Sequence, residues 1–164
     1  MKVNVYTDGA CSGNPGKGGY GILMEWVGKP YVKEFSEGFR LTTNNRMELL
    51  AVIVALEQLK KEGLVVVVYS DSKYVVDSVE KKWVFNWVKK GFKDKKNADL
   101  WRRFLLVYKK HKVKFQWIKG HNEHPQNERC DRLAVMAAQK KILKIDEGFE
   151  LQKNSSPESL DLKP

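Results

Sequence analysis

LVVVVYS, residues 64–70, is the stretch of sequence that decides the fold. Its first five residues are apolar and show no polar alternation, which predicts a strand that is buried on both faces. Parallel strands that helices cover on both sides of a sheet have this pattern. Asp71 follows directly, and a helix is expected from about Ser72 into the 80s. Because α/β sheets bind ligands at the carboxyl ends of such strands, Asp71 is a candidate site residue; a helix N-cap is the alternative.

The segments on both sides of this strand predict further strands and helices. Residues 3–8 alternate with the period of a strand, and Asp8 closes it. The strongest helix pattern, residues 46–61, follows a cluster of capping residues at 42–45 and stops at Gly63. The remaining expected elements are strands at 19–26 and 29–39 joined by Gly28, a helix near 98–109, a strand at 113–120 and a helix at 127–141.

The 164 residues are 42% hydrophobic and 30% charged, which fits one domain with a sizeable core. Gly16, Gly18 and Gly21 satisfy the G-x-G-x-x-G pattern of dinucleotide-binding proteins. That fingerprint requires the glycine turn to open a helix, whereas here it opens a strand. We therefore interpret this match as chance.

Positive charge is concentrated in one segment of a chain whose net charge is +10. Residues 81–119 hold 14 lysines and arginines against two acids, while the rest of the chain holds 16 basic and 18 acidic residues. Such a segment attracts phosphate backbones through counterion release, which indicates a nucleic-acid partner. A solvated lysine-rich loop is the alternative interpretation.

The two cysteines, Cys11 and Cys130, are too few for a disulfide scaffold, and their spacing matches no zinc site. They are typical of free thiols in a reducing compartment. The amino terminus has no apolar signal core, and no apolar run is long enough to span a bilayer. A cytoplasmic location without membrane contact is therefore expected.

Three further carboxylates stand at positions where a charge is unusual. Glu48 lies on an otherwise apolar face of the helix at 46–61, Asp131 lies on an apolar face of the helix at 127–141, and Asp8 ends the first strand. Each has an alternative explanation: a helix-dipole role for Glu48, an ion pair with Arg129 for Asp131, and a turn role for Asp8. Four coincident placements are harder to explain in this way than one.

Asp8, Glu48, Asp71 and Asp131 together form a candidate site for hard divalent cations. Mg²⁺ prefers oxygen ligands and leaves several positions to water and substrate phosphate. Without a cation, such a cluster would repel itself and raise the pKa of some of its members. In a basic chain, these residues predict Mg²⁺-dependent chemistry on a polyanion.

Four blocks of sequence resemble, in order, the motifs of the ribonuclease H family, type 1. The resemblance covers residue 1 to about residue 143 and implies a ribonuclease H-like α/β fold, with a five-stranded mixed sheet in the order 3-2-1-4-5 and flanking helices. It also implies metal-dependent hydrolysis of RNA that is paired with DNA. The blocks are YTDGACSGNPGKGGYG at 6–21, TTNNRMELLAVIVAL at 42–56, YSDSKYVVDSV at 69–79 and WIKGHNEHPQNERCDRLA at 117–134.

The resemblance implies separate roles for the four acidic residues. Two Mg²⁺ ions are expected with substrate, and Mn²⁺ is an alternative ion. Such a pair activates water on one side of a phosphodiester and stabilises the leaving oxygen on the other. Asp8 is expected to bridge the ions, Glu48 and Asp71 to complete one site, and Asp131 to complete the other.

The family's mobile catalytic histidine corresponds to His121. This imidazole is expected to move a proton or to assist product release, and an ordinary surface histidine is the alternative. His124 is expected to be structural. Glu128 is expected to assist near Asp131.

An RNA/DNA hybrid is the expected partner. Recognition of the 2′-hydroxyl would distinguish its RNA strand from its DNA strand. Thr43 and Asn44 resemble the family's grip on the DNA strand, although helix capping alone would explain them. Lys73 stands where many relatives have glutamine, which leaves one substrate contact open. The candidates for reading the 2′-hydroxyl are the backbone from Cys11 to Gly16, Asn14, Asn45 and Glu48.

Residues 81–97 resemble the basic protrusion with which some members of the family hold the hybrid. Trp83 and Trp87, one helical turn apart, are expected either to contact sugars and bases or to anchor the protrusion to the core. Lys89 and Lys90 are expected to contact phosphates.

The expected organisation is a catalytic domain at 1–143 and a C-terminal tail at 144–164 without fixed structure, in a monomeric protein. Two other classes of protein are alternatives. A hybrid-binding module without catalysis would lack the carboxylates, all of which are present. A polynucleotidyl transferase that acts on DNA shares the acidic residues, but such proteins resemble this chain less.

Overall fold

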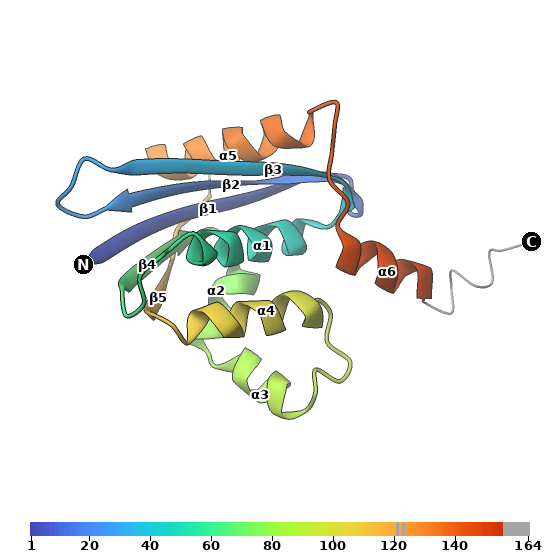
Figure 1. Cartoon of the computed structure of the whole chain (residues 1–164). Coiled ribbons are helices and arrows are strands. Elements are labelled where there is room, and N and C mark those ends of the chain that lie inside the picture. Colours follow the sequence, from blue (N-terminus) through green and yellow to red (C-terminus); the bar gives the residue numbers. More distant parts are fainter. Residues whose placement is uncertain (121, 123, 156–164) are drawn as a thin grey trace, which may run out of the picture.

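The computed structural model describes residues 1–120, 122 and 124–155. Five strands form one mixed sheet in the order β3-β2-β1-β4-β5, as the sequence predicts (Figure 1). The first three strands pair antiparallel, and β4 and β5 continue the sheet in parallel with β1. The strands are β1 (Lys2–Ser12), β2 (Gly16–Trp26), β3 (Val32–Thr42), β4 (Val65–Ser70) and β5 (Lys112–Trp117).

Helices cover both faces of the sheet (Figure 1). One face, at β1, β2 and β3, is covered by α5, and the other carries α1, with α4 packed on α1. The helix α3 lies beyond α4, at the edge of the molecule (Figure 1). The helices are α1 (Asn44–Glu57), α2 (Lys73–Glu80), α3 (Trp83–Lys89), α4 (Ala98–Tyr108), α5 (Pro125–Ala138) and α6 (Glu147–Ser155).

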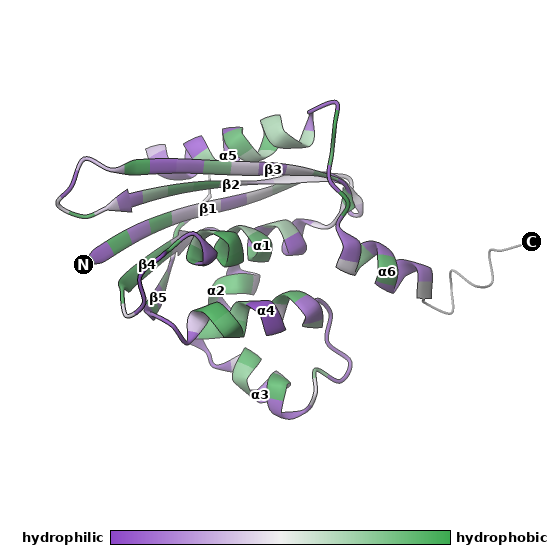
Figure 2. Cartoon of the chain, in the orientation of Figure 1, coloured by the Kyte–Doolittle hydropathy of each residue, from purple (hydrophilic) through white to green (hydrophobic). Residues whose placement is uncertain are grey.

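The core lies between the sheet and α1, and Figure 2 shows hydrophobic residues in green along α1 and the strands. Val66 and Val68 of β4 are fully buried in it. On the opposite face of β4, Tyr69 stacks on Tyr6, but Val65 remains 42% exposed. The predicted burial therefore holds for one face of β4, whereas Val67 and Tyr69 on the other face are half-buried and Val65 is exposed, because α5 covers β1 to β3 rather than β4.

Several element boundaries differ by a few residues from the expectation, including the ends of β1, β3, α1, β5 and α5. The first strand continues to Ser12, so Asp8 lies inside β1, opposite Gly21 of β2, and does not close the strand. The helix α1 ends at Glu57, earlier than the predicted residue 61. The antiparallel partner β2 extends β1, because paired backbone groups favour continued strand where the single-strand pattern predicts a turn.

The expected absence of fixed structure from residue 144 is wrong for most of the described part of this segment. Residues 147–155 form α6, and Asp146 is buried against the guanidinium of Arg46, which is 1% exposed. Asp146 also accepts a hydrogen bond of 2.7 Å from the hydroxyl of Thr42. Local composition does not reveal these partners, because they lie about a hundred residues away in the sequence.

Among the described residues, no helix combines the length and the apolar character needed to cross a bilayer.

Candidate metal centre

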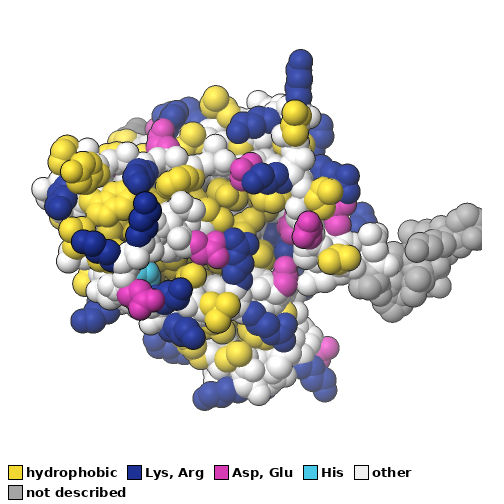
Figure 3. Space-filling model, viewed as in Figure 1, with side chains coloured by type: hydrophobic (Ala, Val, Ile, Leu, Met, Phe, Trp, Pro, Cys, Tyr) yellow, Lys and Arg dark blue, Asp and Glu magenta, His cyan; other side chains and the backbone are white. Residues whose placement is uncertain are grey.

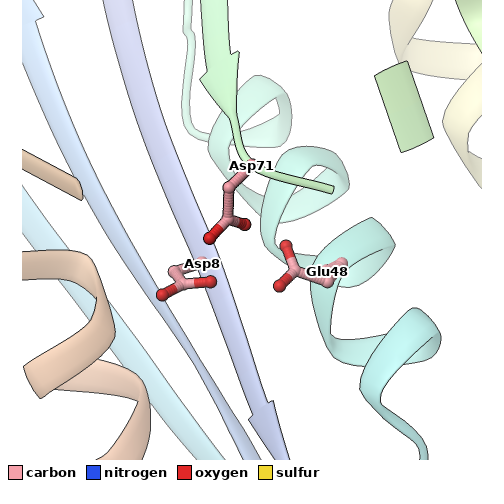
Figure 4. A group of neighbouring side chains, drawn as sticks. All are labelled: Asp8, Glu48 and Asp71. Atoms are coloured by element: carbon pink, nitrogen blue, oxygen red, sulfur yellow. The ribbon is translucent and has the colours of Figure 1, made fainter. Parts of the chain in front are cut away.

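Three of the four predicted carboxylates converge at the carboxyl end of β4. Asp8, Glu48 and Asp71 each offer a carboxylate oxygen within 4.8 Å of the other two. They come from β1, α1 and the residue after β4, and their side chains point toward one another (Figure 4). Oxygen ligands at this spacing, from separate elements, are the kind of site that Mg²⁺ and similar hard cations occupy.

The parallel register of β1 and β4 brings Asp8 next to Asp71. Tyr6 of β1 pairs with Tyr69 of β4 in this ladder. Asp8 follows Tyr6 by two residues, and Asp71 follows Tyr69 by two residues. Asp8 is only 5% exposed, so its turn-residue alternative is wrong. The N-cap of α2 is Ser72, whose hydroxyl accepts from the amide of Val75, and Asp71 therefore does not cap the helix.

Glu48 is the fifth residue of α1, and no acidic residue lies in the first turn of this helix. A helix-dipole role therefore does not explain its charge. The side chain is 3% exposed, and its Oε1 accepts a hydrogen bond of 3.0 Å from the backbone amide of Gly9. Its other oxygen, Oε2, is buried and has no hydrogen-bond partner among the residues that the structure describes. A buried acceptor without a partner is costly, and a bound cation would satisfy it.

The environment of the cluster raises the pKa of its acidic groups. Burial, followed by the charge of Asp71, raises the pKa of Asp8 from 3.8 to about 7. The pKa of Glu48 is raised well above its ordinary value by burial, then by Asp8 and Asp71. Both shifts mean that negative charge is unfavourable here without a counter-ion, so the residues fit a divalent cation.

Asp131 lies at the edge of the same site. It is half-buried on α5 and lines, together with the other three carboxylates, a cavity of about 410 Å³. Its charge contributes to the raised pKa of Asp8. Arg129 does not neutralise Asp131, because its guanidinium makes two hydrogen bonds to Glu34, at 2.6 and 3.0 Å. The predicted apolar face around Asp131 holds for Ala134 and Ala138, whereas Val135 is 37% exposed.

Several of the predicted substrate contacts lie around this cavity. Asn44, Asn45 and Lys73 line it, and all three are exposed. Thr43 is the N-cap of α1, and its hydroxyl accepts from the amide of Arg46 at 3.3 Å. Asn14, at the β1–β2 turn, accepts a hydrogen bond of 3.2 Å from the amide of Asn44, so this turn is tied to the start of α1.

Cys11 lies apart from the carboxylates. It belongs to β1, and its thiol donates to the carbonyl oxygen of Thr42 at 3.4 Å. Cys11 lines a separate cavity, beside Val135 of α5 and Gln139, the C-cap of this helix. Both Cys11 and Cys130 are free, as the sequence predicts.

Of the two neighbouring histidines, only His124 can be placed. It is the N-cap of α5, and its Nδ1 accepts from the amide of Asn127 at 3.2 Å, which confirms its structural role. Glu128 lies in the first turn of the same helix and is half-buried. His121 lies outside the described residues.

The basic protrusion consists of α3 and the residues that lead to α4, and dark blue Lys and Arg side chains surround this part of the molecule (Figure 3). Trp87 packs edge-on against the buried Trp101, with 6.0 Å between ring centroids, and therefore anchors the protrusion. Trp83 is 43% exposed. Lys89 and Lys90 are exposed at the end of α3.

Trp117, the last residue of β5, and Gly120, three residues beyond it, contact Asp71 and are not predicted from the sequence. The indole of Trp117 donates a hydrogen bond of 3.1 Å to the carbonyl oxygen of Asp71. A Cβ at Gly120 would lie 2.6 Å from Asp71 Oδ2, so a larger residue here would displace this carboxylate. Both residues lie at or just beyond the carboxyl end of β5, the strand next to β4. Because α/β sheets bind ligands at this edge, their position could have indicated a role in the site.

Comparisons with known proteins agree with this geometry. The ribonuclease H family model matches residues 1–139. A ribonuclease H of Desulforamulus reducens is 55% identical over 150 residues, which cover 88% of this chain and 92% of that protein. A ribonuclease H of Trichodesmium erythraeum is 51% identical over 154 residues, covering 91% and 96% of the two chains.

Solved structures give the same result. The crystal structure of LC9-RNase H1, described as a type 1 RNase H with the type 2 active-site motif, has a TM-score of 0.77 at 32% identity and covers 98% of this chain and 83% of that one. The structure of LC11-RNase H1 in complex with an RNA/DNA hybrid has a TM-score of 0.58 at 25% identity and covers 90% and 99%.

The fold, the acidic site and these relatives define an endoribonuclease, which is a hydrolase. The chain belongs to the ribonuclease H family, and its type is type 1.

Proposed function

We propose that this enzyme cleaves the RNA strand of RNA/DNA hybrids internally, with a pair of Mg²⁺ ions held by its carboxylates. The convergence of Asp8, Glu48 and Asp71 within 4.8 Å is the observation that carries this proposal. The hybrid bound by the related LC11-RNase H1 supports the choice of substrate.

The four carboxylates would hold the ions in a defined division of roles. When bound, two ions activate the attacking water and stabilise the leaving oxygen of the phosphodiester. Asp8 is the proposed bridging ligand, because it is grouped with Glu48 and Asp71 and its strand, β1, also packs against α5. Asp131, which lies on α5 and lines the same cavity, would complete the second site.

The side chains around the cavity would select the substrate. Asn45 and the turn that carries Asn14 are the proposed readers of the 2′-hydroxyl, which distinguishes RNA from DNA. Thr43 and Asn44 present the start of α1, whose amides suit a phosphate of the DNA strand. His121 is the proposed proton carrier, and Glu128 is proposed to assist near Asp131.

The protrusion would hold the hybrid at a distance from the carboxylates. Lys89 and Lys90 are the proposed phosphate contacts, and Trp83 is the aromatic side chain that remains accessible to sugars or bases. We also propose that the enzyme acts as a monomer in the cytoplasm, which its free cysteines suit.

The test compares matched RNA/DNA hybrid, duplex RNA and duplex DNA, with Mg²⁺, with Mn²⁺ and with EDTA. We expect cleavage of the RNA strand of the hybrid alone, dependent on the metal and lost in Asp71→Asn. Binding of hybrid without cleavage would indicate a non-catalytic hybrid-binding protein, and cleavage of duplex DNA would indicate a polynucleotidyl transferase. Either result would refute the proposal.

A further inference from the structure

Trp117, the last residue of β5, contacts two residues that flank the carboxylate cavity. Its indole N–H donates to the carbonyl oxygen of Asp71, and its ring face lies under the ammonium group of Lys73, with Nζ 4.9 Å from the ring centroid. Trp117 is 40% exposed, so it is not explained as a core residue. One side chain thus links a proposed metal ligand to Lys73, which among the described residues is the lysine that lines the cavity.

The backbone around Trp117 is fixed against β4. The amide of Ile118 donates to the carbonyl oxygen of Ser70 at 2.9 Å, directly before Asp71. Further along, Gly120 passes against the Asp71 carboxylate. The segment 117–120 therefore lies against Asp71, and the indole of Trp117 is fixed both by its backbone and by its hydrogen bond to Asp71.

The contact with the indole determines how Lys73 can act. An aromatic face attracts an ammonium group but does not neutralise its charge, and the lysine N–H donors remain available for an anion. A salt bridge would instead cancel the charge. The ring thus holds a full positive charge at the rim of a cavity whose other charged groups, Asp8, Glu48, Asp71 and Asp131, are all acidic.

We propose, on the basis of the function proposed above, that Trp117 is a positioning residue. It holds the Lys73 ammonium at the rim of the cavity, where Lys73 binds a backbone phosphate of the nucleic acid beside the cleavage site. Its indole N–H separately fixes the backbone of Asp71. The two roles of Trp117 use different parts of the side chain, so they can be separated by substitution.

The variants for this test are Lys73→Gln, Trp117→Leu, Trp117→Phe and the double variant Lys73→Gln/Trp117→Leu. Trp117→Phe keeps an aromatic face for Lys73 and loses only the N–H. The matched control is Lys33→Gln, because Lys33 also lies over an indole, that of Trp26, at 5.7 Å. Trp26 and Lys33 line a cavity with Met1 and Leu64, at the amino ends of β1 and β4, whereas Asp71 follows the carboxyl end of β4.

The first measurement is hybrid binding in EDTA as a function of salt, which needs neither metal nor cleavage. One lost phosphate contact lowers the slope of log K against log salt by about 0.9. We expect this decrease in Lys73→Gln and in Trp117→Leu, and no further decrease in the double variant. Trp117→Phe and Lys33→Gln are expected to keep the wild-type slope.

The second measurement is the kinetics with Mg²⁺. We expect Lys73→Gln to raise KM with little change in kcat, and Trp117→Phe to lower kcat severalfold with little change in KM. A folded Trp117→Leu with the wild-type slope, or slope decreases that add in the double variant, would overturn the proposal. If Trp117→Leu does not fold, a wild-type slope in Lys73→Gln, or a wild-type kcat in Trp117→Phe, would overturn it.

The two measurements also separate this proposal from the proposed function. A wild-type protein that binds hybrid in EDTA but cuts nothing with Mg²⁺ would refute hybrid cleavage, while the salt slopes would still decide the role of Trp117. Intact cleavage with unchanged slopes would refute the role of Trp117 alone.

Discussion

The backbone amide of Gly9 donates a hydrogen bond of 3.0 Å to Oε1 of Glu48, and this bond joins the carboxylate on α1 to the strand that carries Asp8. The close approach depends on glycine, because a Cβ at this position would lie 2.7 Å from the amide nitrogen of Glu48. The spacing of two proposed metal ligands is therefore set by a position that has no side chain.

Replacement of Gly9 by alanine is expected to push α1 away from β1 and to displace Glu48. We expect kcat to fall at least tenfold and Mg²⁺ affinity to decrease, measured by kinetics at varied Mg²⁺ concentration. Gly28→Ala is the control, because the residue has a φ of 81° but nothing lies within 4 Å of the added Cβ. The control should lose stability, by about 1 kcal/mol, and keep its kcat. Equal kcat values in wild type and Gly9→Ala would contradict this view of the site.

Without metal, the carboxylate cluster should make stability depend on pH. The folded protein holds Asp8 with a pKa of about 7, against 3.8 ordinarily, so between these values the folded state binds a proton that the unfolded state has lost. The free energy of unfolding therefore falls as pH rises through this range. Asp8→Asn removes the ionisation, so the metal-free variant should melt several degrees above wild type at pH 8 and lose this advantage toward pH 4.

The measurement is thermal unfolding in EDTA at several pH values. Asp77→Asn serves as control, because Asp77 forms only a surface pair with Lys81, at 3.6 Å. If metal-free Asp8→Asn melts at or below the wild-type temperature at pH 8, the negative charge of Asp8 does not destabilise the folded protein, and the prediction is wrong. Added Mg²⁺ should stabilise the wild type and so reduce the difference in melting temperature between Asp8→Asn and wild type.

Loss of Asp146 should destabilise the whole domain. Arg46 is 1% exposed and forms ion pairs with Asp146 and Asp99. Asp146→Ala therefore leaves the buried guanidinium with Asp99 as its remaining acidic partner among the described residues. We expect a loss of about 3 kcal/mol in urea unfolding. Glu150→Ala removes a pair with the exposed Arg40 and should have little effect. Similar unfolding midpoints for the two variants would argue against a structural role of the Arg46 network.

Trp83 and Trp87 should separate into a binding residue and a structural one. Trp87→Ala removes the contact with Trp101 and is expected to cost about 2 kcal/mol of stability. Trp83→Ala, at an exposed position, should leave stability nearly unchanged and weaken hybrid binding by about 1 kcal/mol. Thermal unfolding and equilibrium binding measure the two effects. The reverse assignment, with Trp83 needed for stability, would contradict the packing described here.

The fold and the acidic cluster were predictable because their signals are local. The apolar run at 64–70 marks a buried strand, and a charge such as that of Glu48 on an apolar helix face marks an unusual site. The strand order of the sheet came from the resemblance to the ribonuclease H family, which four motif blocks in the same order support. Periodicity alone does not determine a strand order.

The remaining features depend on partners that are distant in the sequence. The extension of β1 past Asp8 depends on β2, and the ordered position of Asp146 depends on Arg46. The distinction between Trp83 and Trp87 also comes from tertiary packing, because the two residues have equivalent positions in the helix pattern.

A crystal structure of the enzyme soaked with Mn²⁺, with and without a non-cleavable RNA/DNA hybrid, would test the proposed metal centre. We expect anomalous density for one ion in contact with Asp8, Glu48 and Asp71, and for a second ion near Asp131 when the hybrid is present. Ligand distances near 2.1 Å are expected for a hard cation of this size. Anomalous density elsewhere, or none between these three carboxylates, would contradict the metal centre on which the proposed function depends.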